Sequence, residues 1–161
     1  MDSAQLGVPL YLLRGKVEHD FKNSLKMPPM IYAICYVSDA SKELKNEDLR
    51  LLYKQTIQNN QRSQITGVLI YKDGSFFQIL EGEKQTLISL FEKIKEDTRH
   101  SHILTLFSKE SVRVFEDYQT GFSIVDSYEG LESLRSFLAD KRDISTTSAC
   151  VEGIIKSVLK V

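Results

Sequence analysis

Two apolar segments joined by a short turn constrain the fold of this chain more than any other feature. Residues 65–71 and 76–81 are rich in β-branched, leucine and aromatic side chains, and Lys72-Asp73-Gly74-Ser75 separates them. An Asp-Gly pair between two such segments is a strong signal for a β-hairpin. The sequence therefore predicts an antiparallel strand pair near the middle of the chain.

Strand and helix patterns flank this hairpin on both sides. A strand is predicted at residues 31–37 and a helix from Asn46, which has acidic residues in its first turn, to Asn59-Asn60. A second helix is predicted from just after Gly82 to near Asp97, and strands are predicted around 103–107 and 122–125. The apolar helix faces consist of Leu49, Leu52, Tyr53 and Ile57 in the first helix and Leu87, Leu90, Phe91 and Ile94 in the second.

The order strand, helix, strand, strand, helix, strand is typical of a ferredoxin-like βαββαβ sandwich of the α+β class. We expect both helices on one face of the sheet, an additional fifth strand, and the first two strands paired in parallel through a right-handed crossover. Two shorter helical patterns follow, at 131–138 and 151–159, and form a C-terminal helical extension over residues 127–161. The last pattern carries an apolar stripe that covers the open sheet face or contacts a partner: Val151, Ile154, Ile155, Val158 and Leu159.

The chain has 161 residues, which fits one domain, at residues 30–126, with additions at both ends. Within residues 1–29, Leu6, Leu10 and neighbouring apolar residues fall at helical spacing before Met27-Pro28-Pro29 interrupts the pattern. This segment is either a native helix or a leader with Met30 as the true start, and we favour the leader.

Charge and composition exclude several classes of protein. The net charge of −1 gives no general attraction to nucleic acid or anionic lipid, and no apolar segment is long enough to span a bilayer. Cys35 and Cys150 form no disulfide framework or metal spacing, so we expect reduced thiols in a cytoplasmic protein. We interpret His100 and His102 as solvated and expect no metal site. No glycine-rich phosphate loop or nucleophile motif is present, which argues against Rossmann-type flavin binding.

A glutamine inside an apolar strand points to a binding site. Gln78 lies in Phe76-Phe77-Gln78-Ile79-Leu80, and a buried primary amide left without hydrogen-bond partners costs about 1–3 kcal/mol. Tyr36, in the first strand, and Asn59-Asn60, just before the hairpin, are the polar candidates to lie beside it. Together these residues suggest a pocket for a planar ligand rich in amide groups.

Each of these residues also has a structural interpretation. Tyr36 alone is more often a packed core tyrosine, and Asn59-Asn60 is equally a helix C-terminal signal, because asparagine tolerates the left-handed conformation. Gln78 could cap an exposed edge, while Leu52 and Ile94 are core residues in either case. Only the joint occurrence favours a binding site.

Residues 31 to about 125 resemble the BLUF family, short blue-light sensors that use flavin. The matching residues occur in order along the chain: Tyr36-Val37-Ser38, Asn59-Asn60, Ile65-Thr66-Gly67, Phe77-Gln78-Ile79-Leu80-Glu81-Gly82 and Asp97-Thr98-Arg99-His100. The resemblance implies a flavin bound non-covalently between the two helices, as FAD, with FMN or riboflavin possible. Tyr36 would donate an electron to the excited flavin, and the Gln78 amide would then rearrange by rotation, tautomerisation or both.

The resemblance also implies roles for the residues around the flavin. Asn59 and Asn60 would hold its pyrimidine edge, and Leu52 and Ile94 would sandwich the ring. Three charged residues would bind the rest of the cofactor: Lys93 and Arg99 at a phosphate, and Asp97 at a ribityl hydroxyl.

The chain departs from the family pattern near the end of the match. Where many members have a tryptophan and a methionine before the last strand, this chain has Tyr118 and Thr120, and it contains no tryptophan. This leaves the light chemistry possible but puts the usual output path in doubt. We expect Thr120 or Tyr118 to offer a hydroxyl to the hydrogen-bond network instead.

Three classes of function follow. The first is a single-domain photoreceptor without catalysis, in which light shifts the last strand and the C-terminal helices and signals to an unidentified downstream protein, with self-association into a homo-oligomer. The second is a ferredoxin-like small-molecule-binding regulatory module without photochemistry. The third is an enzyme, a flavin-dependent oxidoreductase or a small hydrolase. Retention of Tyr36 and Gln78 together favours the first.

Overall fold

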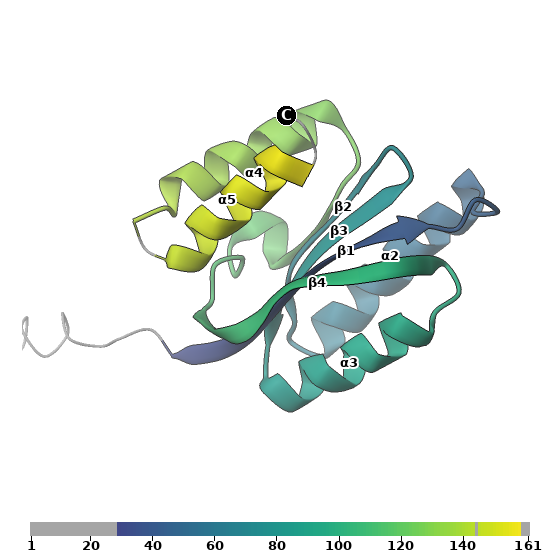
Figure 1. The fold of residues 1–161 in the computed structure, drawn as a ribbon. Helices are drawn as coiled ribbons and strands as arrows, with labels where there is room; N and C mark the ends of the chain where they lie inside the picture. Colours follow the sequence, from purple (N-terminus) through teal and green to yellow (C-terminus); the bar gives the residue numbers. More distant parts are fainter. Residues whose placement is uncertain (1–28, 144, 159–161) are drawn as a thin grey trace, which may run out of the picture.

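A five-stranded sheet with helices on both faces forms the protein (Figure 1). The structure is a computed structural model that describes residues 29–143 and 145–158. Strand order is β4-β1-β3-β2-β5. The strands are β1 (Met30–Ala40), β2 (Thr66–Lys72), β3 (Ser75–Gly82), β4 (His100–Val112) and β5 (Phe122–Val125), and the helices are α2 (Asn46–Arg62), α3 (Lys84–Glu96), α4 (Tyr128–Asp140) and α5 (Thr146–Val158).

Strand pairing confirms the hairpin and corrects one expectation. β2 and β3 pair antiparallel around the turn, β1 pairs antiparallel with both β3 and β4, and β5 pairs parallel with β2. The prediction that the first two strands pair in parallel is wrong, because β3 lies between β1 and β2. β3 suits this central place because seven of its eight residues are buried, as expected for a strand covered on both faces.

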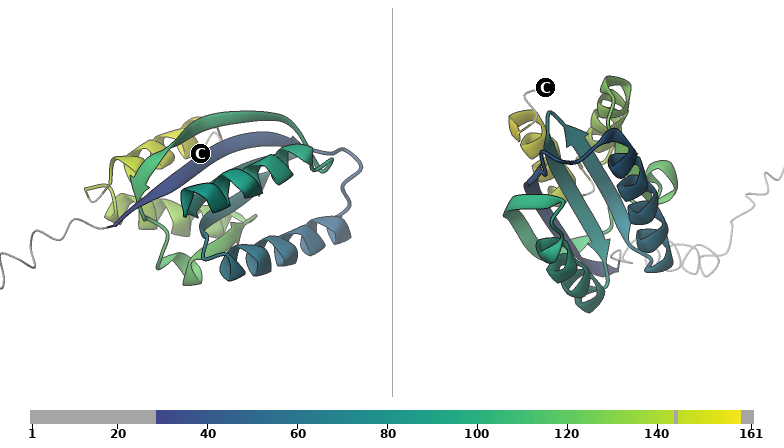
Figure 2. Two further views of the ribbon diagram at one scale, coloured as in Figure 1. Left: turned by 90° about the horizontal axis from the view of Figure 1, so that it is seen from below. Right: turned by 90° about the vertical axis from the view of Figure 1, so that its right-hand side faces the viewer.

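The helices cover the two faces of the sheet separately (Figure 2). Leu52 of α2 and Leu87 of α3 belong to one core, with Tyr36 of the sheet, whereas Leu134 of α4 and Val151 of α5 belong to a second core. We call these the pocket face and the tail face. The α+β ferredoxin-like prediction, with an additional strand and C-terminal helices, is confirmed.

Two element boundaries differ from the prediction. α2 continues past Asn59-Asn60 to Arg62, and β4 has 13 residues instead of the short strand expected at 103–107. β4 is an edge strand with many exposed polar residues, and its register with β1 shifts twice. Its sequence therefore lacks the regular apolar alternation from which the length of a strand is predicted.

The C-terminal stripe covers the open face of the sheet. Val151 and Ile155 are fully buried in the tail-face core, and the partly buried Ile154 packs against it. The prediction for the side chains of Val158 and Leu159, and the interpretation of residues 1–28, lie outside what the structure describes. Within the described part, no helix has the length and apolar character needed to cross a membrane.

Candidate functional site

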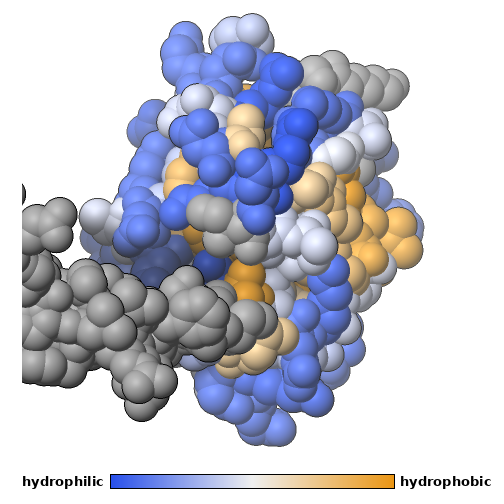
Figure 3. Space-filling model, turned by 90° about the vertical axis from the view of Figure 1, so that its left-hand side faces the viewer, coloured by the Kyte–Doolittle hydropathy of each residue, from blue (hydrophilic) through white to orange (hydrophobic). Residues whose placement is uncertain are grey.

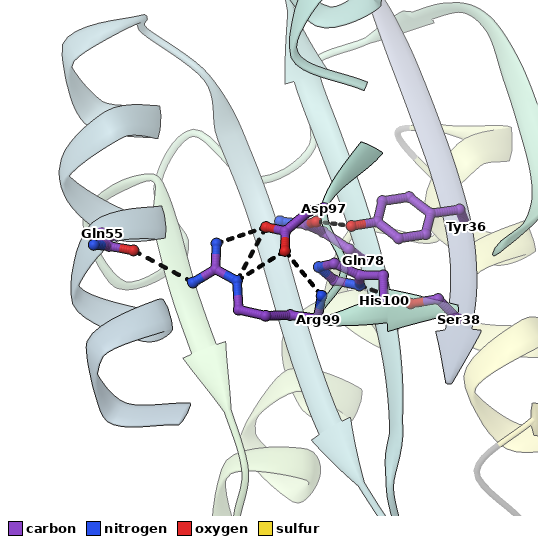
Figure 4. A network of polar contacts seen from close by, with 7 residues as sticks. All are labelled: Tyr36, Ser38, Gln55, Gln78, Asp97, Arg99 and His100. Carbon is purple, nitrogen blue, oxygen red and sulfur yellow. Dashed lines mark hydrogen bonds and ion pairs between the residues drawn. The ribbon is translucent and has the colours of Figure 1, made fainter. Parts of the chain in front are cut away.

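Tyr36 and Gln78 form a buried pair at the centre of the pocket face (Figure 4). The two residues lie directly opposite each other in the register of β1 and β3, so their side chains emerge on the same face of the sheet. The Tyr36 hydroxyl donates a hydrogen bond to Gln78 Oε1. This hydrogen bond satisfies an acceptor site of the Gln78 amide, and Gln78 also lines the cavity described below.

Burial keeps the Tyr36 phenol neutral. Tyr36 is fully buried, and burial raises its pKa well above the ordinary value of 10.0, with further increases from the nearby Asp97 and Cys35. The phenol therefore retains its proton at neutral pH. Its orientation toward Gln78 defines where that proton can go.

A cavity of about 200 Å³ lies beside this pair. Its walls come from β1, β2, β3, the start of β4, α2, α3 and the turn after α3. All nine residues proposed for the site from the sequence line this one cavity: Tyr36, Leu52, Asn59, Asn60, Gln78, Lys93, Ile94, Asp97 and Arg99.

Sequence reasoning missed several residues of the cavity wall. They are Gln55, Thr56, Leu69, Leu90 and His100. Gln55 and Thr56 lie four residues before Asn59 and Asn60, so the helical periodicity could have revealed them.

The expectation that His100 is solvated is wrong. Its ring is partly buried, lies 6.3 Å from the Tyr36 ring in an edge-on arrangement, and its Nδ1 is 2.9 Å from the Ser38 hydroxyl. Burial lowers the pKa of His100, while Asp97 acts in the opposite direction. His102 is exposed on the same strand, and its Nδ1 lies 2.9 Å from Asp39 Oδ2.

The Asn60 amide has an unmet hydrogen bond in the cavity. Asn60 is 2% exposed, and its Nδ2 has no hydrogen-bond partner among the described residues. Asn59 and Asn60 lie in the last turn of α2, which ends at Arg62, and the left-handed residue expected there is Gln64, with φ of 54°, and not an asparagine. A buried amide donor without a partner costs about 1–3 kcal/mol, so its retention at the cavity wall points to a ligand acceptor.

Asp97 and Arg99 form one polar unit after α3. The Arg99 guanidinium donates to both Asp97 carboxylate oxygens at 2.6 to 3.0 Å, and the Arg99 backbone N–H donates to Asp97 Oδ1 at 3.0 Å (Figure 4). The hydrogen bonds from Arg99 hold the pKa of Asp97 below its ordinary value. Arg99 is therefore largely committed to Asp97 within the protein.

A second hollow of about 370 Å³ adjoins the cavity. It shares Asn59, Asn60, Leu90 and Lys93 with the first. Ser63 and Ile65, which follow α2, and polar side chains from the start of α3 complete it. Glu83 occupies the N-terminus of α3, where its carboxylate accepts from the N–H groups of the first helical turn. A bound phosphate would consequently be favoured near Lys93 rather than at that helix N-terminus.

The hydroxyls expected from Tyr118 and Thr120 do not reach the Tyr36–Gln78 pair. Tyr118 is packed in the tail-face core, with its ring 4.7 Å from that of Phe137. The Thr120 hydroxyl donates to the Gln119 carbonyl at 2.6 Å. The expectation that either joins the network is wrong, because Tyr118 lies on the opposite face of the sheet.

The cavity fits the isoalloxazine ring of a flavin. Leu52 and Ile94 face it from the two helices, and the amides of Asn60 and Gln78 offer donors where the pyrimidine edge of the ring presents carbonyl acceptors. Within residues 29–143 and 145–158, no group of three or more His, Cys, Asp or Glu side chains is placed to hold a metal ion.

Comparison with known proteins identifies the same region. A family model described as sensors of blue-light using FAD, the BLUF family, matches residues 31–121. The alpha subunit of photoactivated adenylate cyclase from Euglena gracilis is 35% identical over 77 residues, which is 48% of this chain and 8% of that protein. The chain thus spans only a small part of the curated relatives it matches.

Solved structures agree with this match. The BLUF structure of Klebsiella pneumoniae BlrP1 has a TM-score of 0.56 at 30% identity, covering 69% of this chain and 78% of that one. The photo-activated state of BlsA has a TM-score of 0.55 at 31% identity, covering 65% of this chain and 75% of that one.

Proposed function

This chain belongs to the BLUF family of blue-light sensors that use flavin, and we propose on that premise that it is a photoreceptor driven by Tyr36 and Gln78. The observation that carries the proposal is the buried hydrogen bond from Tyr36 to Gln78 at the wall of a cavity lined by amides and apolar side chains. A bound flavin supplies light absorption and, when excited, an electron acceptor.

The protein's own contribution is a phenol, an amide and the exclusion of water. Removal of an electron from Tyr36 would create positive charge in an apolar environment, which is unfavourable. The Tyr36 proton would therefore move along the existing hydrogen bond to Gln78 Oε1. If Oε1 gains this proton while Nε2 passes one to the electron acceptor, the products are a neutral tyrosyl radical and a neutral Gln78 tautomer. The Oε1 hydroxyl of that tautomer no longer accepts from Tyr36, so Gln78 would rotate or remain as the tautomer and exchange its hydrogen bonds.

We propose FAD as the cofactor, with its ring in the first cavity and its remainder in the adjoining hollow. Asn59 and Asn60 would hold the pyrimidine edge, Leu52 and Ile94 would pack on the ring faces, and Asp97 would bind a ribityl hydroxyl. The side chains of Lys93 and Arg99 would bind the phosphates. Lys93 is better placed, because it lines both the first cavity and the adjoining hollow.

We assign residues 30–126 to light sensing and residues 127–161 to output toward a downstream protein. The helices α4 and α5 pack directly on the sheet that carries Gln78, so a shift of that sheet changes their support. Self-association is part of the proposal. Figure 3 shows an apolar area gathered at one side of a mostly hydrophilic surface, and Leu104 on the edge strand β4 is 60% exposed.

The family is a sensor family, and the proposal assigns no catalysis to this domain. The relatives named as photoactivated adenylate cyclase subunits match this chain over only 8% of their own length, so we do not assign their activity to it.

A light–dark absorption difference spectrum tests the proposal. The purified protein should contain flavin, show a small red shift of its visible bands after blue light, and recover in darkness. Tyr36→Phe and Gln78→Leu should bind flavin but lose the shift, because the first removes the donor hydroxyl and the second removes the amide. Chromatography of the flavin released by denaturation identifies whether it is FAD.

Two outcomes would contradict the proposal. A colourless protein that fails to take up added flavin would favour a ferredoxin-like binding module. Bound flavin without any shift in the wild type would mean that the domain binds flavin without light sensing. As a control, His102→Ala, at an exposed residue outside the cavity lining, should leave the shift unchanged.

A further inference from the structure

A carboxylate on the strand that carries Gln78 is fully buried on the tail face. Glu81 is 0% exposed and lies three residues after Gln78 on β3, so its side chain points to the opposite face of the sheet. Its carboxylate accepts three hydrogen bonds, from the Val114 N–H at 2.9 Å, the Phe115 N–H at 3.0 Å and the Thr66 hydroxyl at 3.0 Å. The proposed light chemistry does not use this group.

These hydrogen bonds hold the connection between β4 and β5. Val114 and Phe115 follow the end of β4, and their N–H groups would be buried donors without Glu81. The Arg113 guanidinium donates to the Thr66 hydroxyl at 2.8 Å and thereby links the same connection to β2. The segment is consequently attached to both strands of the central hairpin.

The connection also contacts the C-terminal helices directly. The fully buried Phe115 ring lies 5.9 Å from the Phe137 ring of α4, and the Tyr118 ring lies 4.7 Å from the same ring. A displacement of the Phe115 backbone would therefore change the packing of α4.

The same connection contains backbone in a costly conformation. Gln119 has φ of 43° and Thr120 has φ of 68°, and the left-handed region is especially unfavourable for a β-branched residue. Such a conformation persists only where surrounding contacts hold it. The segment therefore has a lower-energy alternative if its attachment to β3 is released.

From this arrangement we infer that Glu81 is a positioning residue that couples β3 to the segment 113–121 and, through Phe115 and Phe137, to α4. The inference rests on the proposed function for the origin of the signal, the change of hydrogen bonding at Gln78. A displacement of β3 moves the Glu81 carboxylate with the strand. The N–H groups of Val114 and Phe115 then follow it or lose their acceptor.

Hydrogen exchange of wild type and Glu81→Gln, in darkness and under blue light, tests this coupling. Glutamine keeps the shape of glutamate, but one of the two carboxylate oxygens is replaced by an NH₂ group. Since NH₂ cannot accept a hydrogen bond, the N–H of either Val114 or Phe115 loses its acceptor. In darkness, exchange at Val114 and Phe115 should accelerate about tenfold or more. Under light, the flavin red shift should persist while the light-induced exchange difference in α4 is lost.

Two further variants separate coupling from general damage. Glu116→Gln makes the same change of charge at an exposed residue of the segment and should behave as wild type in every measurement. Thr66→Val removes one donor to Glu81 with little change of shape, and should reduce the α4 difference partially even if Glu81→Gln folds poorly.

Three results would overturn the inference. The first is an unchanged hydrogen-exchange rate at Val114 and Phe115 in Glu81→Gln in darkness. This result would count against the inference whether or not the wild type shows the red shift on which the proposed function depends. Another is a light-induced α4 difference of wild-type size in both Glu81→Gln and Thr66→Val. The third is a wild type with a normal red shift but no α4 difference.

Discussion

The two faces of the sheet are built for different purposes. On the pocket face, α2 and α3 leave a cavity between them, and the Asn60 amide at its wall has an unmet donor among the described residues. On the tail face, α4 and α5 close over the sheet, with Leu134 and Leu138 fully buried, and the Glu81 carboxylate accepts three hydrogen bonds. One face leaves space for a ligand, while the other is closed by packed helices.

A single strand serves both purposes. Along β3, Gln78 faces the cavity, and Phe77, Ile79 and Glu81 face the tail helices. Because these side chains share one backbone, the coupling that we propose between Gln78 and the tail face requires no separate relay. Neighbouring residues in the sequence therefore have unrelated roles.

Truncating one leucine on each face gives the largest expected effect. Leu134→Ala opens a void in a closed core and should lower the free energy of unfolding by about 2–5 kcal/mol. Leu52→Ala should cost clearly less in flavin-free protein, because Leu52 already borders a cavity and has packing partners missing on that side. Urea unfolding compares the two, and equal losses would contradict the distinction between the faces.

Removing the Asn60 amide tests the contribution of a single donor atom on the pocket face. Asn60→Ala should weaken flavin binding about 5- to 150-fold, the equivalent of about 1–3 kcal/mol, because a donor to the ligand is lost. In flavin-free protein the same change should alter stability little, since that donor has no partner in the part of the chain that the structure describes. Fluorescence titration with flavin measures the affinity.

Ser123 offers a matched control for this experiment. Its hydroxyl is also buried without a described partner, but it lies between Phe122 and Ile124 of the pocket-face core and so points to the other face. Ser123→Ala should leave flavin affinity unchanged. A loss equal to that of Asn60→Ala would show that the affinity change does not report a contact in the cavity.

The stability contributions of the Glu81 and Asp97 carboxylates should respond to pH with opposite signs. Burial raises the pKa of Glu81 above its ordinary 4.5, so its contribution to stability is present below about pH 4.5 and is lost as pH rises through the folded-state pKa. Hydrogen bonds from Arg99 lower the pKa of Asp97 below 3.8, so its contribution is present above about pH 3.8 and is lost as pH falls through the folded-state value.

This difference is the smallest of the expected effects, and it is measurable by urea unfolding at a series of pH values. Relative to wild type, Glu81→Gln should gain stability as pH rises from about 4.5, whereas Asp97→Asn should approach wild type as pH falls toward 3. Changes of the same sign in both variants would contradict the assigned causes.

Much of the fold follows from local patterns. The start of α2 at Asn46, the hairpin turn at Asp73-Gly74 and the bounds of β5 agree with the sequence prediction. These elements have strong signals within a few residues of chain: a cluster of acidic residues at a helix start, an Asp-Gly turn and short apolar runs. All nine site residues proposed from the resemblance also meet at one cavity.

The errors arose where the outcome depends on distant parts of the chain. The place of β3 between β1 and β2, the length of the edge strand β4 and the burial of His100 all depend on which strands pair. The face assigned to Tyr118 depends on where the connection before β5 packs. Local periodicity in the sequence does not indicate which strands pair or where the connection before β5 packs.

The sequence by itself determined the order and type of the elements, the apolar faces of the helices, and the pairing of a tyrosine with a glutamine in the middle of apolar strands. Only the tertiary structure decided that Asn60 Nδ2 has no hydrogen-bond partner within residues 29–143 and 145–158 and that the Glu81 carboxylate accepts from the Val114 and Phe115 N–H groups. The reason is physical. Propensity and periodicity act within a few residues, whereas burial and the satisfaction of a polar group depend on atoms more than 30 positions away in the chain.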